Sequence, residues 1–131
     1  MEVTTTSHCF VCGVDNDAGL GAIFTTDREL NRSFCRLTLD TRFQGWRDVV
    51  HGGIIAALLD EACIYAGLGI GKQLVTAELT VRYKKPLPVG EEIFITGEVV
   101  EKRRKVLRVK ARIMVADDVY AEAESRVFIL G

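Results

Sequence analysis

The hydrophobic pattern of the chain is dominated by residues 50–67, VHGGIIAALLDEACIYAG. Between Ile54 and Ala66 the only residues that are not apolar are Asp60 and Glu61. A surface helix shows one apolar stripe and one polar face, whereas this segment is apolar almost all round. We therefore predict a helix that the rest of the fold wraps. Two adjacent carboxylates in such a helix are costly unless they are paired, hydrogen-bonded or used in chemistry.

Most of the other residues alternate between apolar and polar, a pattern that predicts half-buried β-strands. Two strands are expected before the helix, at residues 20–26 and 32–40, and a hairpin turn joins them. Four more are expected after it, at residues 75–83, 93–100, 106–115 and 119–130, with a β-bulge at Gly97. One buried helix combined with a run of antiparallel strands predicts an α+β fold in which a curved sheet wraps the helix.

The length and composition fit a single domain over residues 1–131, in which residues 1–7 are small, polar and expected to be flexible. The formal net charge of −1 argues against nucleic acid as a partner, because phosphate binding needs a basic excess. No apolar run reaches the ~20 residues needed to span a bilayer, so no membrane partner is expected. The first residues lack the features of a signal peptide, and a cytoplasmic location is expected.

The four cysteines are expected to be thiols in a reducing compartment. Cys35 lies in a strand pattern and Cys63 in the predicted helix, so both are interpreted as small core residues. Cys9 and Cys12 form a CxxC pair after His8, which suggests zinc. A structural zinc site needs four ligands, and no second CxxC or HxxxH completes the set. The sequence therefore predicts no metal site, and a redox role for the pair is less favoured still.

The start of the predicted helix has the clearest chemical potential in the chain. His51 is followed by Gly52 and Gly53, which allow a ligand to approach the free N–H groups of the first helical turn. Asp60 follows two turns later. The sequence thus combines an anion-binding helix start with a buried acid, and we interpret this pairing as the best indication of function.

Three stretches resemble one known family. HGGIIAALLDEA resembles the HGG-x6-D helix of the hotdog-fold acyl-CoA thioesterases of the phenylacetate-degradation type. The stretches CFVCGxxNxxGL before the helix and TAELTVRYKKPLPVG after it are also similar to that group. The resemblance implies a hotdog fold, an acyl-CoA or other acyl thioester as substrate, and a homodimer or homotetramer. It implies no separate cofactor, because coenzyme A is part of the substrate.

The resemblance also implies roles for five residues. Asp60 matches the general base or nucleophile, and the backbone N–H of Gly52 matches the donor that polarises the thioester carbonyl. Thr76 matches a Ser or Thr that helps to place water. The alternation of its strand places Thr76 on the polar side, so an ordinary solvent-facing Thr is the alternative. An Asn or Gln before the HGG often assists, and the nearest residue here is Gln44, one position further from His51 than in the family pattern. His51 itself is either a base or, as we favour, a structural residue that orients the loop.

Further residues are candidates for substrate binding. Gly53 lies beside Gly52 at the helix start, and Glu61 follows Asp60, although a salt bridge to a Lys or Arg is the favoured interpretation of Glu61. Basic side chains in two places could hold the phosphates of coenzyme A, and a solvated surface is the alternative for both sets. These residues are Lys84, Lys85, Arg103, Arg104 and Lys105.

Spacing within the helix limits how the site can be built. Gly52 and Asp60 are eight residues apart, which is roughly 12 Å at the helical rise. One carbonyl carbon cannot contact both groups at that separation. Two helices running antiparallel would place Asp60 of one chain near Gly52 of another, so the motif implies a site shared between subunits.

Two other functions remain open at this point. A hotdog dehydratase or hydratase acting on 3-hydroxyacyl thioesters would use a His together with an acid on the helix. In those enzymes the His typically precedes Pro-Gly, and Asp60 stands here where they carry a Glu. A non-catalytic acyl-CoA binding protein would keep the fold but would not need Thr76 to place water.

Overall fold

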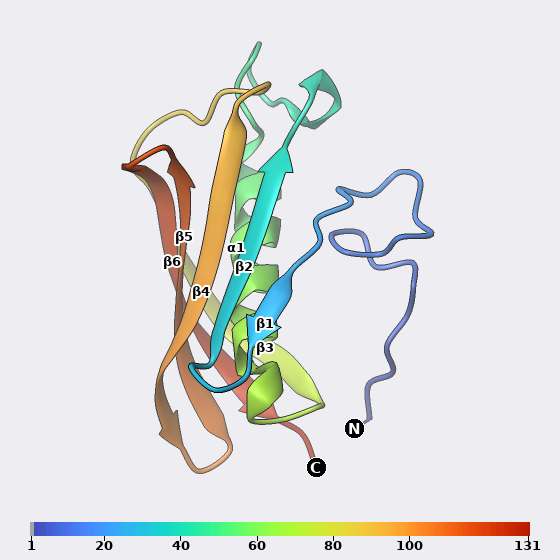
Figure 1. The fold of residues 1–131 in the computed structure, drawn as a ribbon, viewed down its shortest axis with the longest axis vertical. Coiled ribbons are helices and arrows are strands. Elements are labelled where there is room, and N and C mark those ends of the chain that lie inside the picture. The colour runs from blue at the N-terminus through green and yellow to red at the C-terminus, as the bar shows by residue number, and fades with distance from the viewer. Residues whose placement is uncertain (1) are drawn as a thin grey trace.

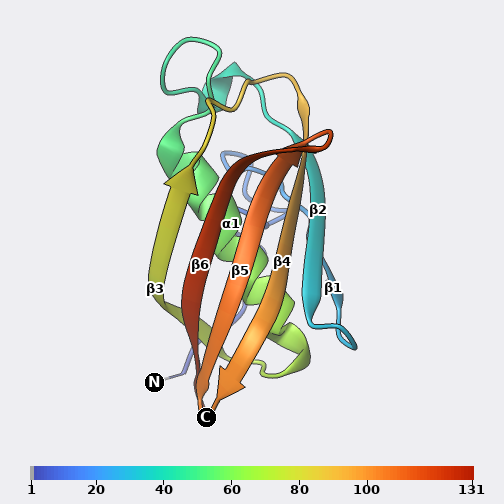
Figure 2. The ribbon, with the colours of Figure 1, turned by 90° about the vertical axis from the view of Figure 1, so that its left-hand side faces the viewer.

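The computed structural model describes residues 2–131, which form one helix packed against a six-stranded antiparallel sheet (Figures 1 and 2). Met1, the first residue of the segment expected to be flexible, lies outside the described residues. Short 3₁₀ turns at Thr41–Phe43 and Gly67–Gly69 flank the helix. The elements are β1 (Thr25–Asp27), β2 (Arg32–Thr38), α1 (Gly52–Ala66), β3 (Leu74–Tyr83), β4 (Glu92–Arg103), β5 (Val106–Val115) and β6 (Asp118–Ile129).

The strand order across the sheet is β1-β2-β4-β5-β6-β3. The chain leaves β2, crosses the inner face of the sheet as α1, and returns as β3 at the opposite edge (Figure 2). β4 then returns next to β2, and β5 and β6 follow by hairpins and fill the gap between β4 and β3. The predicted α+β fold with a sheet curved around one helix is confirmed.

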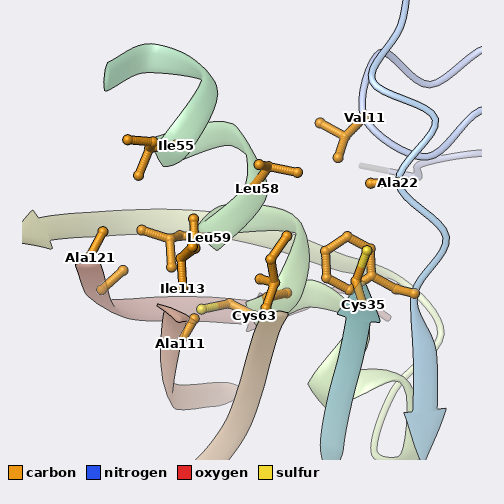
Figure 3. Close-up of a cluster of buried hydrophobic side chains, with 14 of the residues drawn as sticks. Val11, Ala22, Cys35, Ile55, Leu58, Leu59, Cys63, Ala111, Ile113 and Ala121 are labelled. Atoms are coloured by element: carbon orange, nitrogen blue, oxygen red, sulfur yellow. The ribbon is translucent and has the colours of Figure 1, made fainter. Parts of the chain in front are cut away.

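The core lies between α1 and the inner face of the sheet (Figure 3). The helix with its 3₁₀ extension is apolar enough by length and composition for a membrane span, with a mean hydropathy of 1.4, but it is the core helix of this sheet. Its opposite flank, which includes Ala57, Asp60 and Ile64, is only half-buried. The wrapping predicted from the sequence is therefore one-sided in a single chain. The helix residues in the core are Ile55, Leu58, Leu59, Ala62, Cys63 and Ala66.

The segment before β1 packs against the side of the helix that carries Glu61 and Tyr65, instead of forming a long first strand. The strand predicted at residues 20–26 is reduced to β1, which has three residues. Leu20 and Ala22 are nevertheless buried, and their N–H groups donate to the carbonyls of Phe10 and Val11 at 2.8 Å. Buried and exposed residues alternate from residue 20 onward because this extended segment pairs with the backbone around the CxxC, and not with a strand of the sheet.

Gly97 lies in regular register in β4, so the predicted bulge at this position is wrong. The irregularity of β4 falls between Val99 and Glu101. A Cβ atom on Gly97 would lie 2.4 Å from the carbonyl oxygen of Ala62, which also accepts a 2.6 Å hydrogen bond from the buried Ser33 hydroxyl. Glycine is required here because the helix backbone contacts the strand directly.

We expect Gly97→Ala to lower the free energy of unfolding by about 1–3 kcal/mol, the usual cost of inserting atoms into a packed core. The backbone of α1 would have to move away from β4. Urea unfolding followed by circular dichroism measures the change. Thr96→Ala, one residue earlier on the outer face, is the control and should change stability by much less; equal effects of the two substitutions would contradict the role assigned to Gly97.

Candidate active site

The start of α1 leaves one backbone donor of its first turn available. His51 is the N-cap, and its Nδ1 accepts a 2.8 Å hydrogen bond from the N–H of Gly53. The N–H of Ile54 donates to the carbonyl of His51 at 3.0 Å. Within residues 2–131 the N–H of Gly52 meets no acceptor. It is therefore the first-turn donor that can bind an incoming oxygen, and the positive end of the helix dipole supports that role.

Contacts from both flanking segments fix this helix start. The hydroxyl of Tyr83, at the end of β3, donates to the carbonyl of Gly52 at 2.8 Å. The N–H of Val50 donates to Leu87 at 2.8 Å, and the N–H of His51 donates to Phe43 at 2.9 Å. The sequence alone gives no indication of this role for Tyr83, because a Tyr that ends a strand carries no distinctive signal. The donor at Gly52 is thus held between the preceding loop and the following strand.

Thr76 faces Asp60, and a β-bulge places it there. The alternation predicted from the sequence assigned Thr76 to the polar side of its strand. In the structure Ala77 is unpaired, because Thr76 pairs with Val127 and Glu78 pairs with the adjacent Arg126. The hydroxyl of Thr76 therefore points to the helix and donates to Oδ1 of Asp60 at 2.5 Å. The structure thus brings together two of the predicted site residues, Asp60 and Thr76, and leaves Oδ2 of Asp60 available to a substrate or water.

Gln44 lies beside the helix start, but its side chain is engaged within its own loop. The backbone of Gln44 forms an isolated bridge with Val50, and its Oε1 accepts a 3.0 Å hydrogen bond from the N–H of Asp48. Asp48 has a left-handed backbone conformation with φ 61°. Gln44 therefore stabilises the turn before the helix, and its amide nitrogen is the atom left to meet a ligand.

Glu61 contacts a cysteine, so the favoured interpretation of a salt bridge to Lys or Arg is wrong. The thiol of Cys9 donates to Oε2 of Glu61 at 3.2 Å. Cys12 lies beside the same carboxylate and beside the hydroxyl of Tyr65; burial is the main cause that raises the pKa of Cys12 to about 12. The contact with Cys12, together with burial, also raises the pKa of Tyr65. These groups lie on a different flank of α1 from the Thr76 contact.

The basic residues predicted to bind phosphate lie at opposite ends of the molecule. Lys84 and Lys85 follow Tyr83 near the helix start and form ion pairs of 3.5 Å with Glu122 and 3.4 Å with Asp118. The hairpin tip between β4 and β5 is at the other end of the sheet, close to the C-terminus of the helix (Figure 2). The structure does not bring the tip residues to Gly52 of the same chain. These residues are Arg103, Arg104 and Lys105.

Comparisons with known proteins identify the family of this chain. Residues 48–122 match the family model of the thioesterase superfamily. A bovine (Bos taurus) acyl-coenzyme A thioesterase, THEM4, is 24% identical over 124 residues, which cover 93% of this chain and 51% of the relative. This chain therefore spans about half the length of that curated relative.

Solved structures show the same fold. A thioesterase superfamily protein, RHA08564, is 28% identical with a TM-score of 0.85, covering 95% of this chain and 61% of that one. The E. coli PaaI protein from the phenylacetic acid degradation operon is 19% identical with a TM-score of 0.73, covering 77% of this chain and 74% of that one. The fold is the hotdog fold, and since the family match spans more than half of the sequence, the chain belongs to the thioesterase superfamily.

Proposed function

We propose that the protein is an acyl-CoA thioesterase, which hydrolyses a thioester to a free acid and coenzyme A. The observation that carries this proposal is the pairing of a free donor, the N–H of Gly52, with a carboxylate oriented by a hydroxyl, Asp60 with Thr76. Hydrolysis of a thioester requires a donor for the developing oxyanion and a base or nucleophile for the carbonyl carbon. Membership of the thioesterase superfamily supports this assignment.

In the proposed reaction the thioester carbonyl oxygen accepts from the N–H of Gly52. With Asp60 as general base, the carboxylate takes a proton from water, and the oxygen of that water bonds to the carbonyl carbon. The carbon–sulfur bond then breaks, and the proton goes to the departing thiolate. With Asp60 as nucleophile, its oxygen bonds to the carbonyl carbon, the carbon–sulfur bond breaks and coenzyme A leaves as the thiolate. Water then hydrolyses the resulting anhydride, which restores the Asp60 carboxylate and supplies the proton of the thiol. In both routes the hydroxyl of Thr76 holds Oδ1, so that the other oxygen is directed at the substrate.

We further propose that each site is shared between two copies of the chain. Gly52 and Asp60 lie on the same helix about 12 Å apart, and a single thioester cannot contact both. The flank of α1 that carries Asp60 is half-buried in one chain, and β3 is an open edge of the sheet. A second copy packed antiparallel on this side would cover both features.

The engagement of His51 argues against a dehydratase or hydratase. Its Nδ1 accepts from the backbone N–H of Gly53 and so caps the helix. This nitrogen is therefore occupied by a structural hydrogen bond and is not free to transfer a proton to a substrate. The contact of Thr76 with Asp60 argues against a protein that only binds acyl-CoA. A hydroxyl that orients a carboxylate contributes to chemistry and adds little to the recognition of a thioester.

A screen of acyl-CoA substrates tests the proposed function. The purified full chain is incubated with short, medium, long and aromatic acyl-CoAs, and a thiol reagent reports the coenzyme A that is released. We expect at least one class to be hydrolysed with kcat/KM of about 10⁴ M⁻¹ s⁻¹ or more. A change in the absorbance of a conjugated double bond without thiol release would identify a hydratase. Tight binding without turnover would identify a binding protein, and either result would overturn the proposal.

A further inference from the structure

A second cluster of reactive side chains lies away from the Thr76 contact. The thiols of Cys9 and Cys12 and the carboxylate of Glu61 converge, so that their ligand atoms all lie within 4.8 Å of one another. All three residues are partly exposed, so an ion in solution can reach them. We propose that Cys9, Cys12 and Glu61 bind a divalent transition-metal ion of the zinc class.

The turn that carries the two cysteines is shaped as a metal-binding knuckle. The N–H of Gly13 donates to the carbonyl of Cys9 at 2.9 Å, and the N–H of Cys12 donates to Sγ of Cys9 at 3.4 Å. A Cβ atom on Gly13 would lie 2.4 Å from the nitrogen of Cys9, so only glycine permits this turn. The turn therefore holds the two sulfur atoms close together, and a metal ion binds them when their protons are released.

Glu61 supplies the third ligand, which the linear spacing of the sequence does not show. Its Oε2 accepts from the thiol of Cys9, a residue 52 positions earlier. Within residues 2–131 no ion pair involves Glu61. An ion between these atoms would take the place of the thiol proton, and the two thiols would release their protons to solvent. Two thiolates and one carboxylate then surround the divalent cation, with a net charge of −1.

The ligand set favours zinc over magnesium or calcium, which prefer oxygen ligands. Three protein ligands leave one tetrahedral position for water. The hydroxyl of Tyr65 beside Cys12 can donate to a bound sulfur, a typical second-layer contact of such sites. Ligands of a tetrahedral zinc ion lie roughly 3.5–4 Å apart, given zinc–sulfur bonds of about 2.3 Å. The three ligand atoms lie within 4.8 Å of one another in this structure. Rotation of the side chains can bring them to the shorter distances that a zinc ion requires.

The place of the cluster in the fold indicates what the ion would do. Glu61 belongs to α1, whereas both cysteines belong to the segment before β1, which packs against the Glu61 side of the helix. An ion held by all three would tie this segment to the helix. Glu61 is about 100° round the helix from Asp60, so the ion would lie away from that acid and would hold the segment in place without taking part in the proposed hydrolysis.

Cobalt is a spectroscopic probe for this site. The full chain is reduced, stripped with a chelator, and titrated with Co²⁺ and then with Zn²⁺. We expect one Co²⁺ per chain, a sulfur-to-cobalt charge-transfer absorption, and its loss when one equivalent of Zn²⁺ is added. Cys9→Ser and Cys12→Ser should abolish the absorption, and Glu61→Gln should lower the affinity by about tenfold or more. Zn²⁺ should raise the Tm of the wild type but not that of Cys9→Ser.

Matched controls separate this site from chance binding. Cys35→Ala removes a buried thiol outside the cluster, and Glu78→Gln removes a carboxylate on the outer face of the sheet; both variants should bind Co²⁺ as the wild type does. Absence of the charge-transfer absorption would overturn the proposal. Equal affinity in the wild type, Cys9→Ser and Glu61→Gln would do so as well, because the ion would then be adventitious. A Cys9–Cys12 disulfide formed in air, with no metal uptake after reduction, would identify a redox pair instead.

Discussion

Replacing Asp60 with asparagine should lower kcat for thioester hydrolysis by about 10²–10⁴-fold, the usual contribution of a positioned base. Asparagine keeps the shape of the side chain, and its carbonyl oxygen can still accept from the hydroxyl of Thr76. It cannot take a proton from water or attack the carbonyl carbon. Steady-state kinetics with the best substrate of the acyl-CoA screen measures the loss, and circular dichroism verifies the fold.

The control for this substitution is Asp117→Asn, an exposed carboxylate in the turn between β5 and β6, which should keep wild-type kinetics. If Asp60→Asn retained activity within a few-fold of the wild type, the assignment of the base would be wrong. Glu61, the neighbouring carboxylate, would then be the first alternative to test.

Replacing Gly52 with proline should lower kcat by about 10²–10³-fold, because it deletes the donor to the oxyanion. Proline is tolerated at the first position of a helix, where its missing N–H breaks no helical hydrogen bond. His51 has φ −58° and ψ 135°, a conformation that a residue before proline adopts readily. The added Cβ would be 3.6 Å from the ring of Tyr83, an ordinary contact. Gly52→Ala makes the same contact but keeps the N–H, so it is the matched control and should remain active.

The same two variants test whether sites are shared. Asp60→Asn and Gly52→Pro are each expected to be nearly inactive. When they are mixed and allowed to exchange subunits, about half of the dimers should be mixed, by random pairing in a symmetric dimer. Each mixed dimer has one site with both Asp60 and the N–H of Gly52 intact, so activity should return. If the mixture stayed inactive although exchange was demonstrated by mass spectrometry, each chain would have to form its site alone.

The periodicity of apolar residues along the sequence predicts most of the helix and strands of this fold. The helix and β2 to β6 begin and end within a few residues of the predicted ranges, since buried positions recur with the helical or the strand period. The association of a carboxylate with a helix start could also be predicted, because both lie on one element at fixed spacing. The family resemblance is confirmed by the superfamily match.

Contacts between distant segments could not be predicted in this way. Alternation assigned Thr76 to the wrong side of β3, since one unpaired residue, Ala77, reverses the direction of the side chains. The partner of Glu61 is a thiol far away in the sequence, and no period reports such a contact. The strand pattern predicts a bulge at Gly97, whereas glycine is required there because the helix backbone approaches the strand closely.

The position of β3 also bears on how the protein behaves when it is diluted or partly unfolded. Its ten residues form one edge of the sheet, while the other edge, β1, has only three. A short edge strand offers few unpaired backbone groups, but a long one is a template for the strands of other molecules. Any state in which β3 lacks a partner therefore exposes an aggregation-prone edge. If subunits pair along this edge, as proposed above, loss of that pairing should reduce solubility as well as activity, and stocks should be most stable when they are kept concentrated.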